Sequence, residues 1–447
     1  MKVLVVDDDA GVRVGAGYVL HDFLNLDVIE ASSVPEAIGL AKKTLDLDCV
    51  ICAHVIPGGP ALKLYDFFQV SGRVVPFIVL SPDALPQEYT NVRVNGFLKK
   101  PFDIFELRAL VQSVLGLPAG DVGAGDEYTR VRVSTLLSLG NVPFELFVRL
   151  GEAKFIKLST AGDSLSKEDL SKYADKHVEF LYIQRRDREQ FLEALASTVR
   201  KGVQSGASPK PSTMAKGFEI ALSAQEGLAD VVSTLGLSDA AKQIIKGNVD
   251  LVIQSLNSNA AFVDLLSQME IQSDSYISSH SVMVSYTACG LVTLLDWSTE
   301  HVQQKLAYAA VLHDLPHRED AIARLEEGNE YLMKVSGRKV EDFEQHPLRA
   351  AKLVQMMPEI PDGVAEIVAQ HHELPDGTGY PGRLLHSRIE PLSAVFIIAE
   401  RLVHHTALPQ KKGDLAGFVS IWQDTFARGD FKRIMAALHK ASDQGNI

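Results

Sequence analysis

The chain has 447 residues, a formal net charge of −13 and 46% hydrophobic residues. A chain of this length is expected to form about two to four domains, each burying its own core. No basic run exceeds two residues, as in Lys99-Lys100 and Lys411-Lys412. This argues against DNA as a partner, because affinity for a polyanion comes largely from clustered Lys and Arg.

No apolar run approaches the roughly 18 residues that a membrane span needs. The N-terminal stretch MKVLVVDDDA reaches acidic residues too early for a secretory signal. Cys49, Cys52 and Cys289 are too few for a disulfide framework. Cys49 and Cys52 form a C-x-x-C, but they lie in the apolar run LDCVICA, which we interpret as a buried strand with no redox role. We therefore expect a cytoplasmic protein without a membrane partner.

Strand-like and helical stretches alternate over residues 1–118. KVLVVDDD, DVIEAS, DCVICAHV, PFIVLS and NGFLKKP favour strands, and PEAIGLAKKTL favours a helix between two of them. This alternation predicts a doubly wound α/β domain with a parallel sheet. Such domains place their sites at the carboxyl ends of the strands.

The first domain resembles a response-regulator receiver. The residues that match the receiver pocket are Asp7, Asp8, Ala53, Ser81 and Lys100. Ala53 stands where the family carries its phosphoacceptor aspartate, and alanine has no oxygen to phosphorylate. The resemblance therefore implies a pseudo-receiver used for docking or dimerisation.

A small α+β domain is expected over residues 127–202, after a Gly-rich linker at 119–126. RVRVSTLL and FELFVRLGEAKFIKL favour strands, the second folded into a hairpin at Gly151-Glu152. SKEDLSKYA and RDREQFLEALASTV favour helices. The stretch 203–213 is predicted to be a second linker. No catalytic cluster is evident between 127 and 202.

Residues 214–440 are predicted to form an all-α domain, and ten of the fourteen histidines fall between His280 and His405. Surface histidines need not cluster in this way. Several of them are placed at the ends of predicted helices or, as with His346-Pro347, at a predicted helix start. A lone histidine at such a position is usually an ordinary core residue. Together they supply neutral imidazoles, and Asp314 supplies a carboxylate, a donor set that suits Fe, Mn or Zn.

A carboxylate such as Asp314 can bridge two ions. A pair of ions about 3.5–4 Å apart suits the hydrolysis of a phosphate ester.

The constellation resembles the HD-GYP family of cyclic di-GMP phosphodiesterases over roughly residues 255–405. The "HD" is His313-Asp314, and the family's H-P is His346-Pro347. Its HHE-x-x-DG-x-GYP motif is matched by His371, His372, Glu373, Asp376, Gly377, Gly379, Tyr380 and Pro381. The resemblance implies hydrolysis of cyclic di-GMP to linear pGpG and leaves GMP open as a further product.

The resemblance also implies two divalent ions, Fe or Mn, and a role for each matching residue. One ion takes His280, His313, Asp314 and Glu400, and the other takes His346, His371, His372 and the shared Asp314. Asp314 orients the nucleophile, and His317 occupies the position of a phosphate-contacting lysine. Asp376, Gly377, Gly379, Tyr380 and Pro381 form a loop for substrate or for a partner protein. Signalling proteins and a second copy of the chain are further implied partners.

Four departures from the family pattern keep other functions open. Glu400 replaces an aspartate, and His317 replaces the lysine of HD-x-GK. Tyr276 stands where some members carry a glutamate for a third ion, so two ions are expected. An arginine-rich motif after the late helix is absent. The alternatives are a metal-containing cyclic dinucleotide sensor, a protein-interaction module with little turnover, or a hydrolase of another phosphate ester. His404, one turn after Glu400, is expected to support the site from outside or to lie at the surface.

Overall fold

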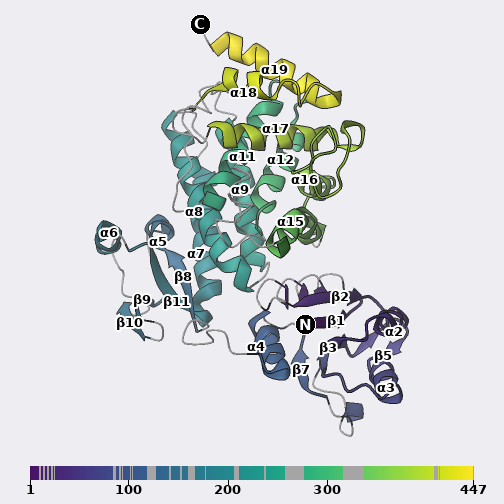
Figure 1. Ribbon diagram of the computed structural model, residues 1–447. Coiled ribbons are helices and arrows are strands. Elements are labelled where there is room, and N and C mark those ends of the chain that lie inside the picture. Colours follow the sequence, from purple (N-terminus) through teal and green to yellow (C-terminus); the bar gives the residue numbers. More distant parts are fainter. Residues whose placement is uncertain are drawn as a thin grey trace. The chain divides into compact units, whose positions relative to one another are not determined.

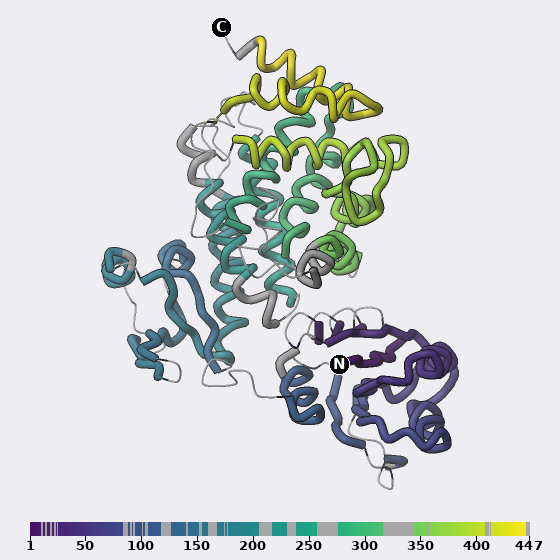
Figure 2. The backbone as a smooth tube through the Cα atoms, in the orientation of Figure 1, coloured from purple at the N-terminus to yellow at the C-terminus, as the bar shows by residue number. Residues whose placement is uncertain are grey.

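The computed structural model describes the chain except for residues 10–11, 14–15, 18–19, 22–23, 25, 84–86, 90–91, 93, 101, 103, 118–126, 140–141, 152–153, 160–166, 177, 206–210, 236–237, 257–275, 316–336, 356, 407–410, 412 and 446–447. The chain divides into two units (Figure 1). One comprises Met1–Val122 with Thr234–Gly236, and the other comprises Gly123–Ser233 with Leu237–Ile447. Figure 2 traces the backbone from the purple N-terminal unit to the yellow C-terminal helices.

The first unit contains a five-stranded parallel sheet in the order β2-β1-β3-β6-β7. Its strands are β1 (Lys2–Val6), β2 (Asp27–Ala31), β3 (Leu47–Ala53), β6 (Phe77–Ser81) and β7 (Gly96–Lys99). All five were expected from the sequence, and the predicted fold class is confirmed. The connections include α2 (Val34–Lys43), α3 (Leu62–Val70), α4 (Ile104–Leu115), the 3₁₀ turn η2 (Gln87–Tyr89), and the short pair β4 (Val55–Ile56) and β5 (Gly59–Pro60).

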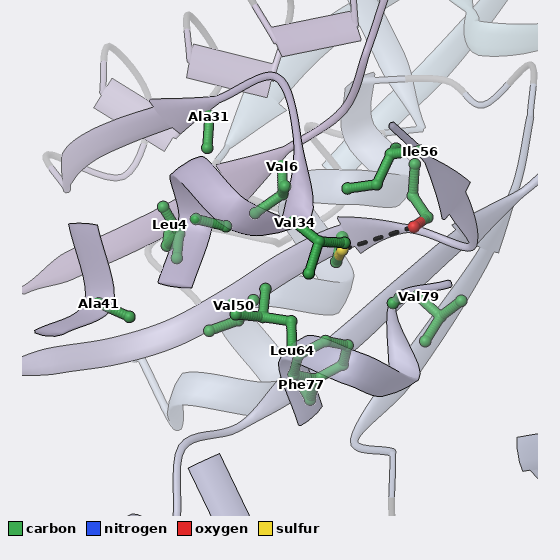
Figure 3. Packing of buried hydrophobic residues seen from close by; sticks show 14 of the residues in the cluster. Leu4, Val6, Ala31, Val34, Ala41, Val50, Ile56, Leu64, Phe77 and Val79 are labelled. Carbon is green, nitrogen blue, oxygen red and sulfur yellow. Dashed lines mark hydrogen bonds between the residues drawn. The ribbon is translucent and has the colours of Figure 1, made fainter. Parts of the chain in front are cut away.

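The central strands of this sheet are buried on both faces, which explains their nearly continuous apolar runs. Successive side chains of a strand point to opposite faces. One core therefore contains Leu4, Val6, Val50 and Val79, packed with residues of α2 and α3 (Figure 3). The other contains Val3, Val5, Ile51, Ile78 and Leu80. Cys49 and Cys52 are buried free thiols, as the strand interpretation predicted.

The second unit begins with a four-stranded antiparallel sheet in the order β10-β9-β11-β8. Its strands are β8 (Tyr128–Arg132), β9 (Leu146–Gly151), β10 (Lys154–Ser159) and β11 (Phe180–Gln184), and its helices are α5 (Val133–Leu139) and α6 (Lys167–Asp175). The predicted β9–β10 hairpin is confirmed. The prediction that RVRVSTLL is one strand is wrong, because α5 begins at Val133 and buries Val133 and Leu136 at helical spacing.

The predicted linker at 203–213 is wrong at both of its ends, and residues 206–210 between them lie outside the described residues. After the 3₁₀ turn η3 (Arg185–Asp187), α7 (Arg188–Ser205) extends into this stretch, and α8 (Pro211–Leu235) begins within it. Helix α7 packs closely on α9 (Asp239–Leu256), where a Cβ on Gly247 would lie 2.3 Å from Cγ1 of Val199. Helix α7 thus continues from the small sheet into the packing of the later helices. The predicted boundaries 127–202 and 214–440 stay predictions.

The remaining described helices form an all-α assembly. They are α11 (Tyr276–Val292), α12 (Glu300–Leu312), α15 (Gly337–Gln355), α16 (Val364–Gln370), α17 (Pro391–Thr406), α18 (Leu415–Trp422) and α19 (Gly429–Gly445), with the 3₁₀ turn η6 (His386–Arg388). Every residue of α11 is buried, so this helix is central. Among the described residues, no helix combines the length and apolar character that a membrane crossing needs.

The prediction that a helix begins at His346-Pro347 is wrong, because Pro347 lies inside α15. Proline removes one intrahelical hydrogen bond and usually ends or kinks a helix. Here Ala350, Ala351 and Val354 bury the face that follows Pro347. Tertiary packing on this face therefore offsets the local cost.

Candidate metal centre

Histidines and carboxylates from five segments of the second unit converge in its helical part. Helix α11 carries His280, the end of α12 carries His313 and Asp314, and α15 carries His346. His371 and His372 follow α16, and Glu400 and His404 lie on α17. These helices pack on one another, α11 on α12 and α17, and α16 on α12, α15 and α17. All of these side chains are buried except that of His404, which is half-buried.

The ends of α12 and α16 orient two of the imidazoles. Nδ1 of His313 lies 2.8 Å from the carbonyl oxygen of Ala310, and Nδ1 of His371 lies 2.6 Å from that of Val368. A carbonyl oxygen only accepts, so each Nδ1 carries the proton and donates it. Nε2 of each ring then keeps its lone pair for the interior. Metal-bound histidines are commonly oriented by such an outer hydrogen bond.

Asp314 lies between two groups of histidines. Its Oδ2 is 3.3 Å from Nε2 of His313, and its Oδ1 is 3.5 Å from Nε2 of His346. The two oxygens of one carboxylate therefore face two different imidazoles. This is the placement expected of a carboxylate that bridges two ions.

Three sets of side chains within the described residues have the spacing of metal ligands. In each set the ligand atoms lie within 4.8 Å of one another. The sets are His280, His313 and Asp314; His346, His371 and His372; and His280, Glu400 and His404. The first set contains three of the four residues expected around one ion, and the second contains the three histidines expected around the other, without Asp314. Glu400 does not join the first set but groups with His280 and His404.

Burial favours the neutral, metal-binding form of three of these imidazoles, those of His280, His371 and His372. Desolvation lowers the pKa of His371 well below its ordinary value, and the neighbouring rings of His346 and His313 lower it further. Desolvation likewise lowers the pKa of His280 and of His372. Neutral imidazole is the form that ligates, so a buried cluster of these rings with Asp314 and Glu400 fits a divalent ion chemically.

The loop that carries the GYP motif is held by Glu373, to which the sequence assigned no role. This carboxylate is 1% exposed and accepts hydrogen bonds from the backbone N–H of Gly382, at 2.5 Å, and of Leu384, at 2.7 Å. A buried acid is rare unless it is paired. The sequence shows Glu373 within the HHE motif, but its burial is visible only in the structure. Glu373 thus positions the loop and is absent from all three ligand sets.

The residues of the GYP loop have different structural roles. Tyr380 lies against His372, with ring centroids 4.7 Å apart, and is joined to Pro381 by a cis peptide bond. Gly379 is required by close packing, because a Cβ there would lie 2.2 Å from the backbone nitrogen of Leu374. Gly377 has a φ of 81°, which favours glycine. Asp376 is exposed, and its Oδ1 accepts hydrogen bonds from Thr378.

The receiver-like pocket of the first unit is closed by an ion pair. Nζ of Lys100 lies 2.5 Å from Oδ2 of the fully buried Asp7, while Asp8 is exposed. Ser81 Oγ accepts a hydrogen bond from the backbone N–H of Asp83. Ala53 is buried at the end of β3. With no acceptor carboxylate at that position, the lysine pairs with an acid of the first loop.

His317, the residue in the place of the family's lysine, falls outside the described residues. His404 is brought closer to the ligands than expected, since its ring centroid is 4.7 Å from that of His280.

Comparisons with known proteins identify the helical part by class. Residues 257–416 match the HD domain family, so the chain contains an HD domain. Bd1817, a HDG"Y"P protein from Bdellovibrio bacteriovorus, is similar at 21% identity and a TM-score of 0.49, over 71% of this chain and 99% of that chain. No curated protein matches the chain.

Receiver domains match a shorter stretch. Chemotaxis protein CheY4 of Vibrio cholerae is 28% identical with a TM-score of 0.24, over 26% of this chain and 98% of that chain. The receiver domain of the hybrid histidine kinase CckA is 26% identical with a TM-score of 0.23, over 26% of this chain and 99% of that chain. The family match is to an HD domain within the helical part.

Proposed function

We propose that the protein is a phosphodiesterase that hydrolyses cyclic di-GMP to linear pGpG with two divalent ions, Fe or Mn. The observation that carries the proposal is the position of Asp314, whose two oxygens face His313 and His346. In this assignment His280, His313, Asp314 and Glu400 hold one ion, and His346, His371, His372 and Asp314 hold the other.

The buried residues around the centre would each perform one task. Bound ions would neutralise phosphate charge and lower the pKa of water. Asp314 would orient the attacking water and accept its proton at a carboxylate oxygen. The water oxygen then bonds to phosphorus, the bond from phosphorus to the 3′ oxygen breaks, and that oxygen leaves with a proton. Tyr380, packed on His372, would provide a surface for the substrate beside the centre.

Incubation of the metal-reconstituted protein with cyclic di-GMP, followed by chromatography, tests this function. We expect linear product from the natural protein and none from His313→Ala, with metal content measured in both. A natural protein that carries metal and forms no product would contradict the phosphodiesterase.

A nucleotide sensor with little turnover is the second candidate, and the position of Glu400 favours it. Its Oε1 lies 3.8 Å from Nε2 of His280 and 3.9 Å from Nδ1 of His372, and it is not grouped with His313 and Asp314. A carboxylate displaced in this way would change the coordination of the ion that it holds. If calorimetry detects binding of cyclic di-GMP and chromatography detects no hydrolysis product, the protein is a sensor. Turnover gained by Glu400→Asp together with His317→Lys would point the same way.

The receiver-like unit is proposed to act in protein contacts within a cytoplasmic signalling pathway. Its Asp7–Lys100 pair and Ala53 support a role without phosphorylation. A partner protein or a second copy of the chain would dock on this unit or on the GYP loop. Treatment with a small phosphodonor should leave the protein unlabelled, whereas labelling of an aspartate would contradict the pseudo-receiver.

A further inference from the structure

We infer that His404 is a ligand of the ion that His280 and Glu400 hold, and that Tyr276 positions it. This inference rests on the proposed metal centre. It adds His404 and Tyr276, which the sequence did not place among the ligands of that centre. His280, Glu400 and His404 offer three donor atoms within 4.8 Å of one another. Imidazole and carboxylate are donor types that suit Fe, Mn or Zn.

The helical register of α17 brings His404 to this position. Residues four apart lie on the same face of a helix, so Glu400 and His404 point the same way. Glu400 is buried, and Oε1 lies 3.8 Å from Nε2 of His280 on the neighbouring helix α11. Glutamate is one methylene longer than aspartate, and the longer side chain lets its carboxylate join His404.

Tyr276 fixes the ring of His404 from the outside. Its hydroxyl lies 3.2 Å from Nδ1 of His404, and its ring stacks on His280 at a centroid distance of 5.7 Å and an interplanar angle of 7°. When Nδ1 of His404 donates to the phenol oxygen, Nε2 keeps the lone pair that a metal needs. Outer hydrogen bonds of this kind orient metal-bound histidines and tune their affinity.

The test measures bound metal and not activity. The full-length protein, His404→Phe, Tyr276→Phe and His405→Phe would be equilibrated with Mn²⁺ at a series of buffered free concentrations, and bound metal would be measured by mass spectrometry. His405→Phe is the matched control, because the adjacent His405 pairs with Asp414. Circular dichroism of each metal-free protein would establish that the fold is retained.

We expect His404→Phe to lose the binding of one ion and Tyr276→Phe to weaken it by about 10–100-fold. His405→Phe should bind as the natural protein does. If His404→Phe and Tyr276→Phe bind metal unchanged while His346→Ala loses it, the role of His404 is overturned and the proposed centre stands. If the natural protein binds no Mn²⁺ and no Fe²⁺, both are overturned.

Discussion

Glu373 shows how one buried carboxylate can organise a functional loop. Its side chain is 1% exposed, and its oxygens accept hydrogen bonds from the backbone N–H groups of Gly382 and Leu384. Its two neighbours, His371 and His372, are candidate ligands. The loop and the metal centre are therefore connected through three consecutive side chains.

Glu373→Ala should lower the free energy of unfolding by about 1–3 kcal/mol, because it removes two hydrogen bonds that backbone N–H groups donate to a buried carboxylate. Chemical denaturation at pH 7 would measure the loss. Glu390→Ala removes an exposed acid of the same region and should change the stability little. Equal effects of the two substitutions would show that the loop does not depend on Glu373.

The three cysteines are buried free thiols, and their burial predicts low reactivity. Burial raises the pKa of the Cys49 thiol to about 12 and raises those of Cys52 and Cys289 as well. The thiolate is the reactive form, so a raised pKa removes it at pH 8. We expect no reaction of the folded protein with a disulfide reagent at pH 8, and three reactive thiols after unfolding. Rapid reaction of Cys49 or Cys52 in the folded protein would contradict the buried-strand interpretation.

Helix α18 is stabilised at its N-terminus by a side-chain cap. Asp414 caps its N-terminus, with Oδ1 accepting from the backbone N–H of Gly417 at 2.8 Å and Oδ2 lying 3.1 Å from Nε2 of His405. The hydrogen bond from Gly417 lowers the pKa of Asp414, and His405 adds to this. The helix is thereby joined to the end of α17, which carries Glu400 and His404.

Asp414→Ala should cost about 1 kcal/mol of stability at pH 7, the usual value of an N-cap. Because the folded-state pKa is lowered, this contribution is present above the unfolded-state pKa and is lost as the pH falls through the folded-state value. The difference between the natural protein and Asp414→Ala should thus narrow at acidic pH. Denaturation curves at several pH values would measure it, with the exposed Asp424→Ala as control.

Helix boundaries differ most from expectation where local and tertiary preferences conflict. At His346-Pro347 the proline predicts a boundary, yet α15 continues through it. From Val133 onward the sequence still favours a strand, yet α5 begins there and buries Val133 and Leu136. In both places the burial of an apolar face outweighs the local propensity.

For the whole molecule, metal binding and folding should be linked. The candidate ligands come from α11, α12, α15, α17 and the turn after α16, so they meet only in the folded chain. A ligand that binds only the folded state stabilises it by about 2.7 kcal/mol at a free concentration one hundred times its Kd. Removal of metal should therefore lower the unfolding temperature.

Thermal unfolding with excess Mn²⁺ and with a chelator would measure this difference. A double variant, His346→Ala with His371→Ala, should show a smaller shift because it removes one of the three candidate ligand sets and leaves the other two. A natural protein whose unfolding temperature is the same in both conditions would contradict a metal centre in the helical part.

The sequence by itself determined the class of each part and most of the candidate residues. Apolar strands that alternate with helices specify the parallel sheet, and the order of the histidine motifs specifies the HD domain, because both signals are local in the chain. Only the tertiary structure decided which donors meet. Glu400 faces His404 and His280, Glu373 holds a loop, and Lys100 pairs with Asp7. These outcomes depend on packing between distant segments, which spacing along the chain does not encode.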